Sequence, residues 1–107
     1  MKLVIDISEY QKYISETQWD LLATVLDGVI IRIVYGTTFD TNATNAIQHS
    51  VDRCLPWTAY GWVDPTKSMN AQQTKFRQAI DIHNPPSIFN DYEQYWTNWE
   101  AYMKQDL

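Results

Sequence analysis

The stretch Ser87–Glu93, Ser-Ile-Phe-Asn-Asp-Tyr-Glu, has the pattern of a buried β-strand that ends in two carboxylates. Side chains two positions apart on a strand point to the same side of the sheet, so Asp91 and Glu93 share one face. Paired acids at the carboxyl end of a strand suit general acid/base chemistry on a polar bond. An exposed strand end with ordinary solvated acids is the alternative, and this stretch alone leaves both interpretations open.

A second acidic strand opens the chain, because residues 3–8 read Leu-Val-Ile-Asp-Ile-Ser. The β-branched apolar residues are typical of a strand that is covered on both faces. An unpaired carboxylate in such a strand is costly, so Asp6 either has a hydrogen-bonded structural role or lines a site. Ser8 has the same parity as Asp6, and Gln11 follows in the loop.

Strands and helices alternate between these two stretches. Thr17 is the expected N-cap of the first helix, and Gly28 is its expected C′ residue. We predict strands at 3–8, 29–35, 55–62 and 87–93, and helices at 17–27, 43–54, 68–81 and 96–105. This alternation predicts right-handed βαβ crossovers and a parallel sheet within one domain, 1–107.

The polar exceptions in the strands gather near the carboxyl ends. Asp6, Asp91 and Glu93 lie there on the first and fourth strands, and Tyr60 and Trp62 lie there on the third. Active sites of α/β barrels occupy this face, and open α/β sheets bind ligands at the same edge. Either architecture therefore predicts that these side chains lie in one small cavity.

The sequence also predicts the surroundings of four further residues. An arginine inside an apolar strand indicates that Arg32 pairs with a carboxylate across the barrel or sheet, or else contacts a substrate. Cys54 is the sole cysteine, so it forms no intramolecular disulfide, and we expect it to be buried in helix packing. We expect His49 to be solvated on its helix. We expect His83 in the linker before the last strand, away from the acids.

Composition excludes several classes of partner. The 107 residues are 45% hydrophobic, with a net charge of -5, which disfavours binding to nucleic acid and to anionic membranes. No apolar run approaches the about 20 residues of a membrane-spanning helix. No leader pattern precedes the first strand, so we expect no export signal in the chain itself.

Several short motifs occur in order along the chain. They are Ile5-Asp6-Ile7-Ser8 with Gln11, Val29-Ile30-Ile31-Arg32 leading to Tyr35-Gly36, Ala59-Tyr60, Gln73 with Phe76, and Asp91-Tyr92-Glu93. Together they resemble the glycoside hydrolase family 25 lysozymes, the muramidases of bacteria and phages, whose signatures are a D-x-S-x-x-Q start and a D-x-E strand. The resemblance covers essentially the whole chain. Each motif alone is weak, and the ordered set carries the specificity.

The resemblance implies hydrolysis of the β-1,4 bond between N-acetylmuramic acid and N-acetylglucosamine in peptidoglycan. By motif, Glu93 would be the general acid, Asp91 would orient the acetamido group or stabilise the transition state, and Asp6 would complete the acidic cluster. Crowded carboxylates raise one another's pKa, so one of them stays protonated near neutral pH and donates to the leaving oxygen. We expect the substrate to be bound by Tyr60, Trp62, Tyr35 and Arg32.

The resemblance also implies surroundings and partners. No metal or organic cofactor is needed, and the partner is the glycan strand of peptidoglycan. Action at the bacterial cell wall, outside the cell, is expected, with phage-type release or non-classical export. Two alternatives stay open: a non-catalytic relative that binds cell-wall glycan, and a small α/β domain for assembly or regulation in which the acids merely cap strands.

The chain departs from the family in length and in two local positions. The family fold is an eight-stranded barrel of nearly twice this size, so we expect a TIM-barrel-like α/β fold made of its first four βα units. A second chain or a C-terminal half would then complete the barrel and cover apolar residues such as Val4, Ile31 and Ile33 or their neighbours. The segment after Asp40, a candidate helix cap, does not match cleanly. Gly61 replaces a polar residue and could change a substrate subsite.

Overall fold

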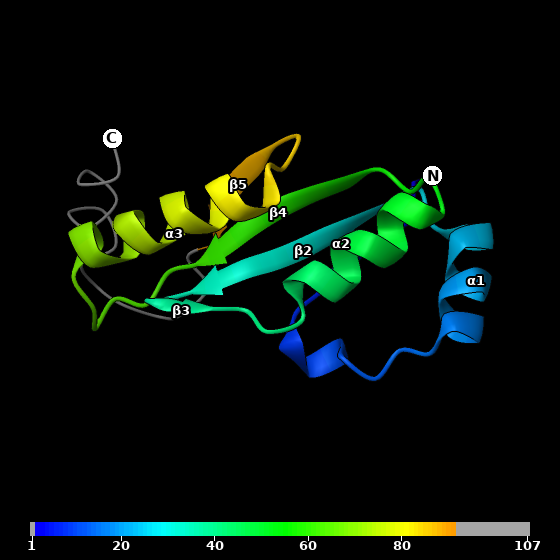
Figure 1. The fold of residues 1–107 in the computed structure, drawn as a ribbon, viewed down its shortest axis with the longest axis horizontal. Coiled ribbons are helices and arrows are strands. Elements are labelled where there is room, and N and C mark those ends of the chain that lie inside the picture. Colours follow the sequence, from blue (N-terminus) through cyan, green and yellow to red (C-terminus); the bar gives the residue numbers. More distant parts are fainter. Residues whose placement is uncertain (1, 92–107) are drawn as a thin grey trace.

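The computed structural model describes residues 2–91, which form one mixed α/β unit (Figure 1). In chain order the elements are β1 (Val4–Ile7), the 3-10 turn η1 (Glu9–Gln11), α1 (Glu16–Val25), β2 (Gly28–Tyr35), β3 (Thr38–Phe39), α2 (Ala43–Asp52), β4 (Trp57–Trp62), α3 (Met69–His83) and β5 (Ile88–Asp91). The predicted α/β class is confirmed, and so are the four predicted strands as far as the described residues extend. The predicted helix at 96–105 lies outside the described residues.

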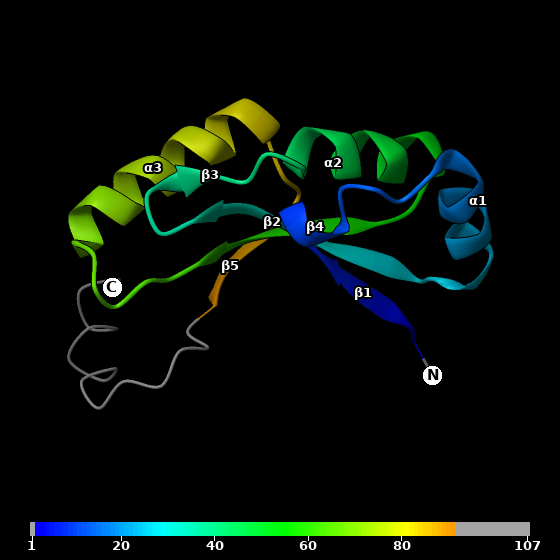
Figure 2. The same ribbon diagram turned by 90° about the horizontal axis from the view of Figure 1, so that it is seen from below.

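The sheet has the strand order β1-β2-β4-β5, and these four strands are parallel. The short strand β3 is not among the predicted strands, and it pairs antiparallel with β2. Seen from below, the helices lie on one side of the sheet, with α2 and α3 over its face and α1 beside α2 (Figure 2). The opposite face carries no helix from the described part of the chain.

The core lies between the sheet and the helices. Ile7, Val29, Ile31 and Ala59 are at most 2% exposed, and they belong to the same cluster as small helix residues such as Ala43, Ala46 and Ala79. Alanine brings no side chain beyond Cβ, so it lets a helix approach a sheet closely. The helix-facing positions of the strands are therefore apolar and buried.

Two residues expected to lie uncovered are in fact in this core. Ile31 and Ile33 are both 0% exposed, whereas Val4 on the edge strand is 49% exposed. Side chains alternate along a strand, so Ile31 points to the helices while Ile30 and Arg32 take the other face. A register shift between Arg32 and Val34 accommodates Ile33 as an extra residue.

The first helix begins and ends differently from the prediction. Ser15, not Thr17, is the N-cap: its hydroxyl accepts from the Gln18 backbone at 3.1 Å, and the Gln18 side chain accepts from the Ser15 backbone at 2.8 Å. This capping box satisfies two amide groups at the helix start. Leu26 is already extended, so Gly28 is the first residue of β2 and not a C′ residue.

The predictions for the second helix and the linker also need correction. His49 is half-buried rather than fully solvated: its ring stacks on Trp19 of α1 at 5.3 Å between centroids, joining the two helices. Cys54 is exposed, because α2 ends at Asp52 and the chain turns there with a positive φ of 55°. His83 is the last residue of α3 and does not lie in the linker. No helix within residues 2–91 has the length and apolar character to cross a bilayer.

Candidate active site

A cavity of about 460 Å³ opens on the uncovered face, near the carboxyl ends of β1, β2 and β4. Five of the residues predicted from the sequence line it, namely Asp6, Arg32, Tyr35, Tyr60 and Trp62. Glu9 and Tyr10 of η1 also line it and were not predicted. Their signal in the sequence was their position directly after the first strand, at the edge of the sheet where α/β folds carry their sites.

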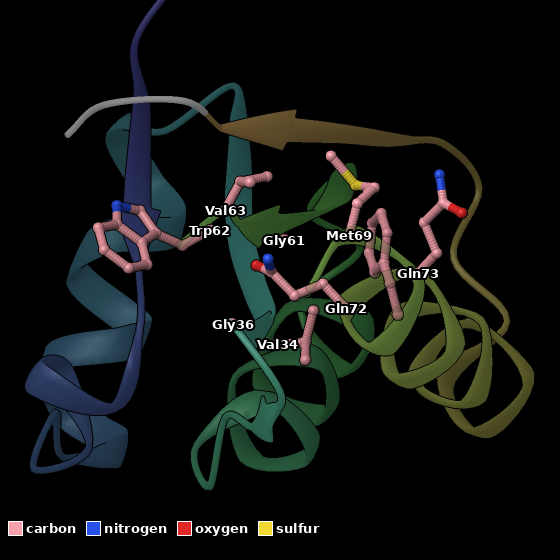
Figure 3. Close-up of a pocket in the computed structure, with 9 residues that line it drawn as sticks. Val34, Gly36, Gly61, Trp62, Val63, Met69, Gln72 and Gln73 are labelled. Carbon is pink, nitrogen blue, oxygen red and sulfur yellow. The ribbon is translucent and has the colours of Figure 1, made fainter. Parts of the chain in front are cut away.

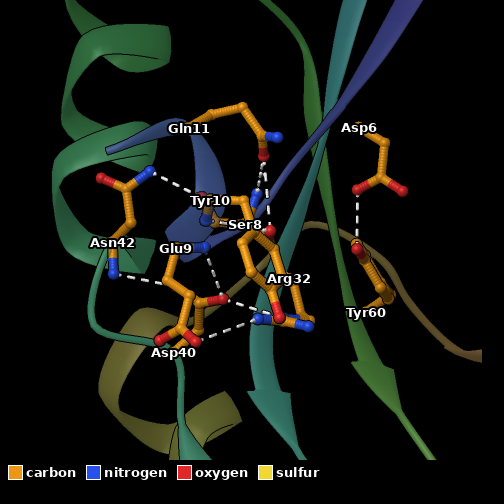
Figure 4. A network of polar contacts seen from close by, with 9 residues as sticks. All are labelled: Asp6, Ser8, Glu9, Tyr10, Gln11, Arg32, Asp40, Asn42 and Tyr60. Carbon is orange, nitrogen blue, oxygen red and sulfur yellow. Dashed lines mark hydrogen bonds and ion pairs between the residues drawn. The ribbon is translucent and has the colours of Figure 1, made fainter. Parts of the chain in front are cut away.

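A hydrogen bond across the sheet fixes the acid of β1. The Tyr60 hydroxyl donates to Asp6 Oδ1 at 2.7 Å (Figure 4). The two residues come from β1 and β4, so the bond spans the intervening strand β2. Tyr60 is 5% exposed while Asp6 is exposed, so a buried ring holds a carboxylate that faces solvent in the cavity.

We expect Tyr60→Phe to lower the free energy of unfolding by about 1 kcal/mol, because it removes this hydroxyl donor and keeps the ring. Urea denaturation of the wild type and the variant measures the difference. Tyr13→Phe is the matched control, since Tyr13 is 85% exposed. Equal unfolding midpoints for wild type and Tyr60→Phe would show that the bond to Asp6 does not stabilise the fold.

Arg32 pairs with a carboxylate, as predicted, and its main partner is Asp40. Arg32 Nε donates to Asp40 Oδ2 at 2.8 Å, and the two side chains are 10% and 0% exposed. Asp40 also accepts from the backbone N–H of Glu9 at 3.0 Å and of Asn42 at 2.8 Å. The buried Asp40 carboxylate therefore connects β2, η1 and the start of α2. Asp40 itself is not the helix cap, because the N-cap of α2 is Asn42.

Ser8 and Gln11, two residues of the first motif, stabilise the turn η1 by hydrogen bonds. The Gln11 side chain accepts from the Ser8 backbone N–H at 2.8 Å, and Ser8 Oγ accepts from the Tyr10 backbone N–H at 3.3 Å. The Asn42 side chain donates to the Ser8 carbonyl at 3.0 Å (Figure 4). Ser8 and Gln11 thus shape the rim of the cavity through the backbone.

Aromatic rings flank the Arg32 guanidinium. Its central carbon lies 4.5 Å from the centroid of the Tyr35 ring and 5.6 Å from that of Tyr10. Partial burial raises the pKa of Tyr35, the Glu9 carboxylate raises it further, and Arg32 acts in the opposite direction. Tyr35 therefore remains a neutral hydroxyl at physiological pH.

The two acids of the last strand are less fully described. The backbone of Asp91 pairs with Trp62 at the carboxyl end of β5, the same end of the sheet as Asp6. Glu93 lies outside the described residues. The grouping of three acids in one cavity stays a prediction. Within residues 2–91, no cluster of three or more His, Cys, Asp or Glu side chains is placed to hold a metal ion.

Gly61 lies on the other face of the sheet, away from the acidic cavity. It lines a small pocket of about 30 Å³ between β4 and α3, with Val34, Met69 and Gln72 around it (Figure 3). A Cβ on Gly61 would come within 3.1 Å of Val34 Cγ1 and 3.4 Å of the Phe76 ring. The expectation that Gly61 changes a substrate subsite is therefore wrong, since the glycine makes room for α3.

Comparison with known proteins rests on structure, because no family model and no curated protein matches the sequence. The glycosyl hydrolase 25 GHIP of Streptococcus pneumoniae has a similar structure, with a TM-score of 0.79 and 22% identity over 96% of this chain and 51% of that chain. This chain has the fold of about half of a glycosyl hydrolase 25 structure. The endolysin ply40 of Listeria monocytogenes bacteriophage P40 agrees, with a TM-score of 0.68 and 21% identity over 89% of this chain and 48% of its catalytic domain.

The modular autolysin LytC of Streptococcus pneumoniae, solved in complex with a synthetic peptidoglycan ligand, also has a similar structure. LytC matches with a TM-score of 0.68 and 22% identity over 89% of this chain and 23% of that chain. The present chain thus spans about half, or less, of the solved structures that it resembles.

Proposed function

We propose that this chain carries the catalytic cleft of a lysozyme-type peptidoglycan hydrolase, which cleaves the β-1,4 bond between N-acetylmuramic acid and N-acetylglucosamine. The observation that carries the proposal is the cavity at the carboxyl ends of the parallel strands, lined by Asp6, Arg32, Tyr35, Tyr60 and Trp62. The similar structures include a peptidoglycan-bound autolysin and an endolysin, which supports a glycan substrate. Flat amphipathic rings beside a carboxylate suit binding to a sugar.

In this proposal each acid has the role that the resemblance to the D-x-E motif implies. Glu93 protonates the leaving glycosidic oxygen, and Asp91 orients the acetamido group or stabilises the positive charge that develops on the sugar. Asp6, held by Tyr60, adds a negative charge at the same edge of the sheet. Like charges nearby favour a protonated Glu93, which is the form that donates a proton.

We further propose that residues 1–107 correspond to the first four βα units of a TIM-barrel-like catalytic domain. The half-length match to GHIP supports this interpretation, and the sheet face that lacks a helical cover would be the barrel interior. A second chain or a C-terminal half would then complete the barrel and the saccharide cleft. The site of action would be the bacterial cell wall.

The same half-length match favours one alternative, a non-catalytic relative that binds cell-wall glycan. Binding needs the aromatic cavity wall, whereas hydrolysis needs the complete set of acids. A small α/β assembly domain remains the third hypothesis, and it requires no glycan affinity.

Two assays on the purified chain separate these functions. Clearing of a gel that contains bacterial cell walls is the result that the hydrolase proposal predicts, and Asp6→Asn should clear much less. Co-sedimentation with cell walls without clearing would favour the non-catalytic binder. A folded chain that neither clears nor co-sediments, both alone and with the half that completes its barrel, would contradict the proposed function.

A further inference from the structure

Tyr10 is unusual for an aromatic side chain next to a cavity, because it is 79% exposed. Its backbone is nevertheless held firmly. Ser8 Oγ accepts from the Tyr10 N–H, and the preceding N–H of Glu9 donates to the buried Asp40 carboxylate. A side chain with only two rotatable bonds on a fixed backbone loses little entropy when it binds a ligand, as in tyrosine-rich binding surfaces.

The Arg32 guanidinium offers donors to the same space. Nε is engaged by Asp40, while Nη2 lies 3.9 Å from Glu9 Oε1, which is too far for a hydrogen bond. Among the residues that the structure describes, neither Nη group has a hydrogen-bond acceptor. Because the side chain is only 10% exposed and lines the cavity, a ligand there is the natural acceptor.

The charge around this part of the cavity selects the kind of acceptor. One positive charge, on Arg32, stands against three carboxylates, those of Asp6, Glu9 and Asp40, which leaves a local charge of -2. A ligand carboxylate would be repelled at this position. A neutral carbonyl oxygen takes the Nη donors without that penalty.

We propose that Tyr10 and Arg32 form a saccharide subsite for a neutral, acetamido-bearing pyranose. The Tyr10 ring stacks on the apolar face of the sugar, and an Arg32 Nη group donates to the acetamido carbonyl oxygen. The inference rests on the proposed function and adds to it: N-acetylglucosamine occupies this end of the cleft, and the carboxylate-bearing N-acetylmuramic acid lies elsewhere.

Isothermal titration with two neutral oligosaccharides tests the subsite. The probes are the β-1,4-linked tetramers of N-acetylglucosamine and of glucose, which differ in the acetamido groups. We expect the N-acetylglucosamine tetramer to bind wild type about tenfold more tightly, because the glucose tetramer leaves the Arg32 donors without their acceptor. Equal affinities for the two tetramers would overturn the assignment of Arg32.

The matched variants are Tyr10→Ala and Tyr13→Ala, since both tyrosines are highly exposed and only Tyr10 lines the cavity. We expect Tyr10→Ala to weaken binding of the N-acetylglucosamine tetramer by about two- to tenfold, with Tyr13→Ala unchanged. Equal effects of the two variants would overturn the stacking role. If wild type clears cell walls but binds neither tetramer, the subsite is wrong and the hydrolase proposal stands. If wild type neither clears cell walls nor binds either tetramer, both the subsite and the hydrolase proposal are wrong.

Discussion

Glu93→Gln should lose at least about 100-fold in wall-lytic activity while the protein stays folded, because general acid catalysis contributes about this factor or more. Glutamine keeps the shape of the side chain but has no carboxylic proton to donate to the leaving oxygen. The rate of turbidity loss in a cell-wall suspension measures the effect. Glu16→Gln is the matched control, since Glu16 is an exposed residue in the first turn of α1.

Near-normal lysis by Glu93→Gln would refute its assignment as the general acid. The neighbouring acids give a second check, because Asp6→Asn and Asp91→Asn should each slow lysis strongly. If both were silent in a lytic protein, the acidic cluster would not be the catalytic centre.

Asp40→Ala is the substitution with the largest expected cost in stability. The Asp40 side chain is fully buried and accepts hydrogen bonds from Arg32, Glu9 and Asn42. Its removal leaves a mostly buried guanidinium without its partner, and such a loss costs about 3–5 kcal/mol. A domain of this size has a total stability of about 5–15 kcal/mol, so the urea midpoint should fall sharply.

Asp52→Ala provides the comparison, because Asp52 lies on the exposed end of α2 and accepts only from the Gln48 side chain in the described part of the chain. Its effect should stay within about 0.5 kcal/mol. A loss of less than about 1 kcal/mol for Asp40→Ala would mean that Arg32 finds another acceptor and that Asp40 does not hold the cavity rim.

The strands of this fold could be predicted because they are covered apolar runs. Val29–Tyr35 could be recognised from its own residues, and the pairing of Arg32 followed from the cost of a buried charge. The identity of its partner could not be predicted, since Asp40 lies in a loop that also suits a helix cap. Ser15 and Thr17 offered competing caps, and only the reciprocal bond to Gln18 separates them.

Part of the candidate site could be predicted from the sequence. Strand parity brought Asp6, Tyr60 and Trp62 to one edge, and the structure places all three around one cavity. Parity fails where the register shifts: Ile33 lies in the core, as its parity with Ile31 predicts, but the next residue, Val34, is also buried in the core. Tyr10 was missed because nothing in a local pattern distinguishes an exposed rim tyrosine from an ordinary surface residue such as Tyr13.

The central claim is tested most directly by mass spectrometry of the fragments released from purified peptidoglycan. A lysozyme-type hydrolase should release glycan fragments with new reducing ends on N-acetylmuramic acid, and Glu93→Gln should release almost none. New reducing ends on N-acetylglucosamine, or the same fragments from wild type and Glu93→Gln, would contradict the account.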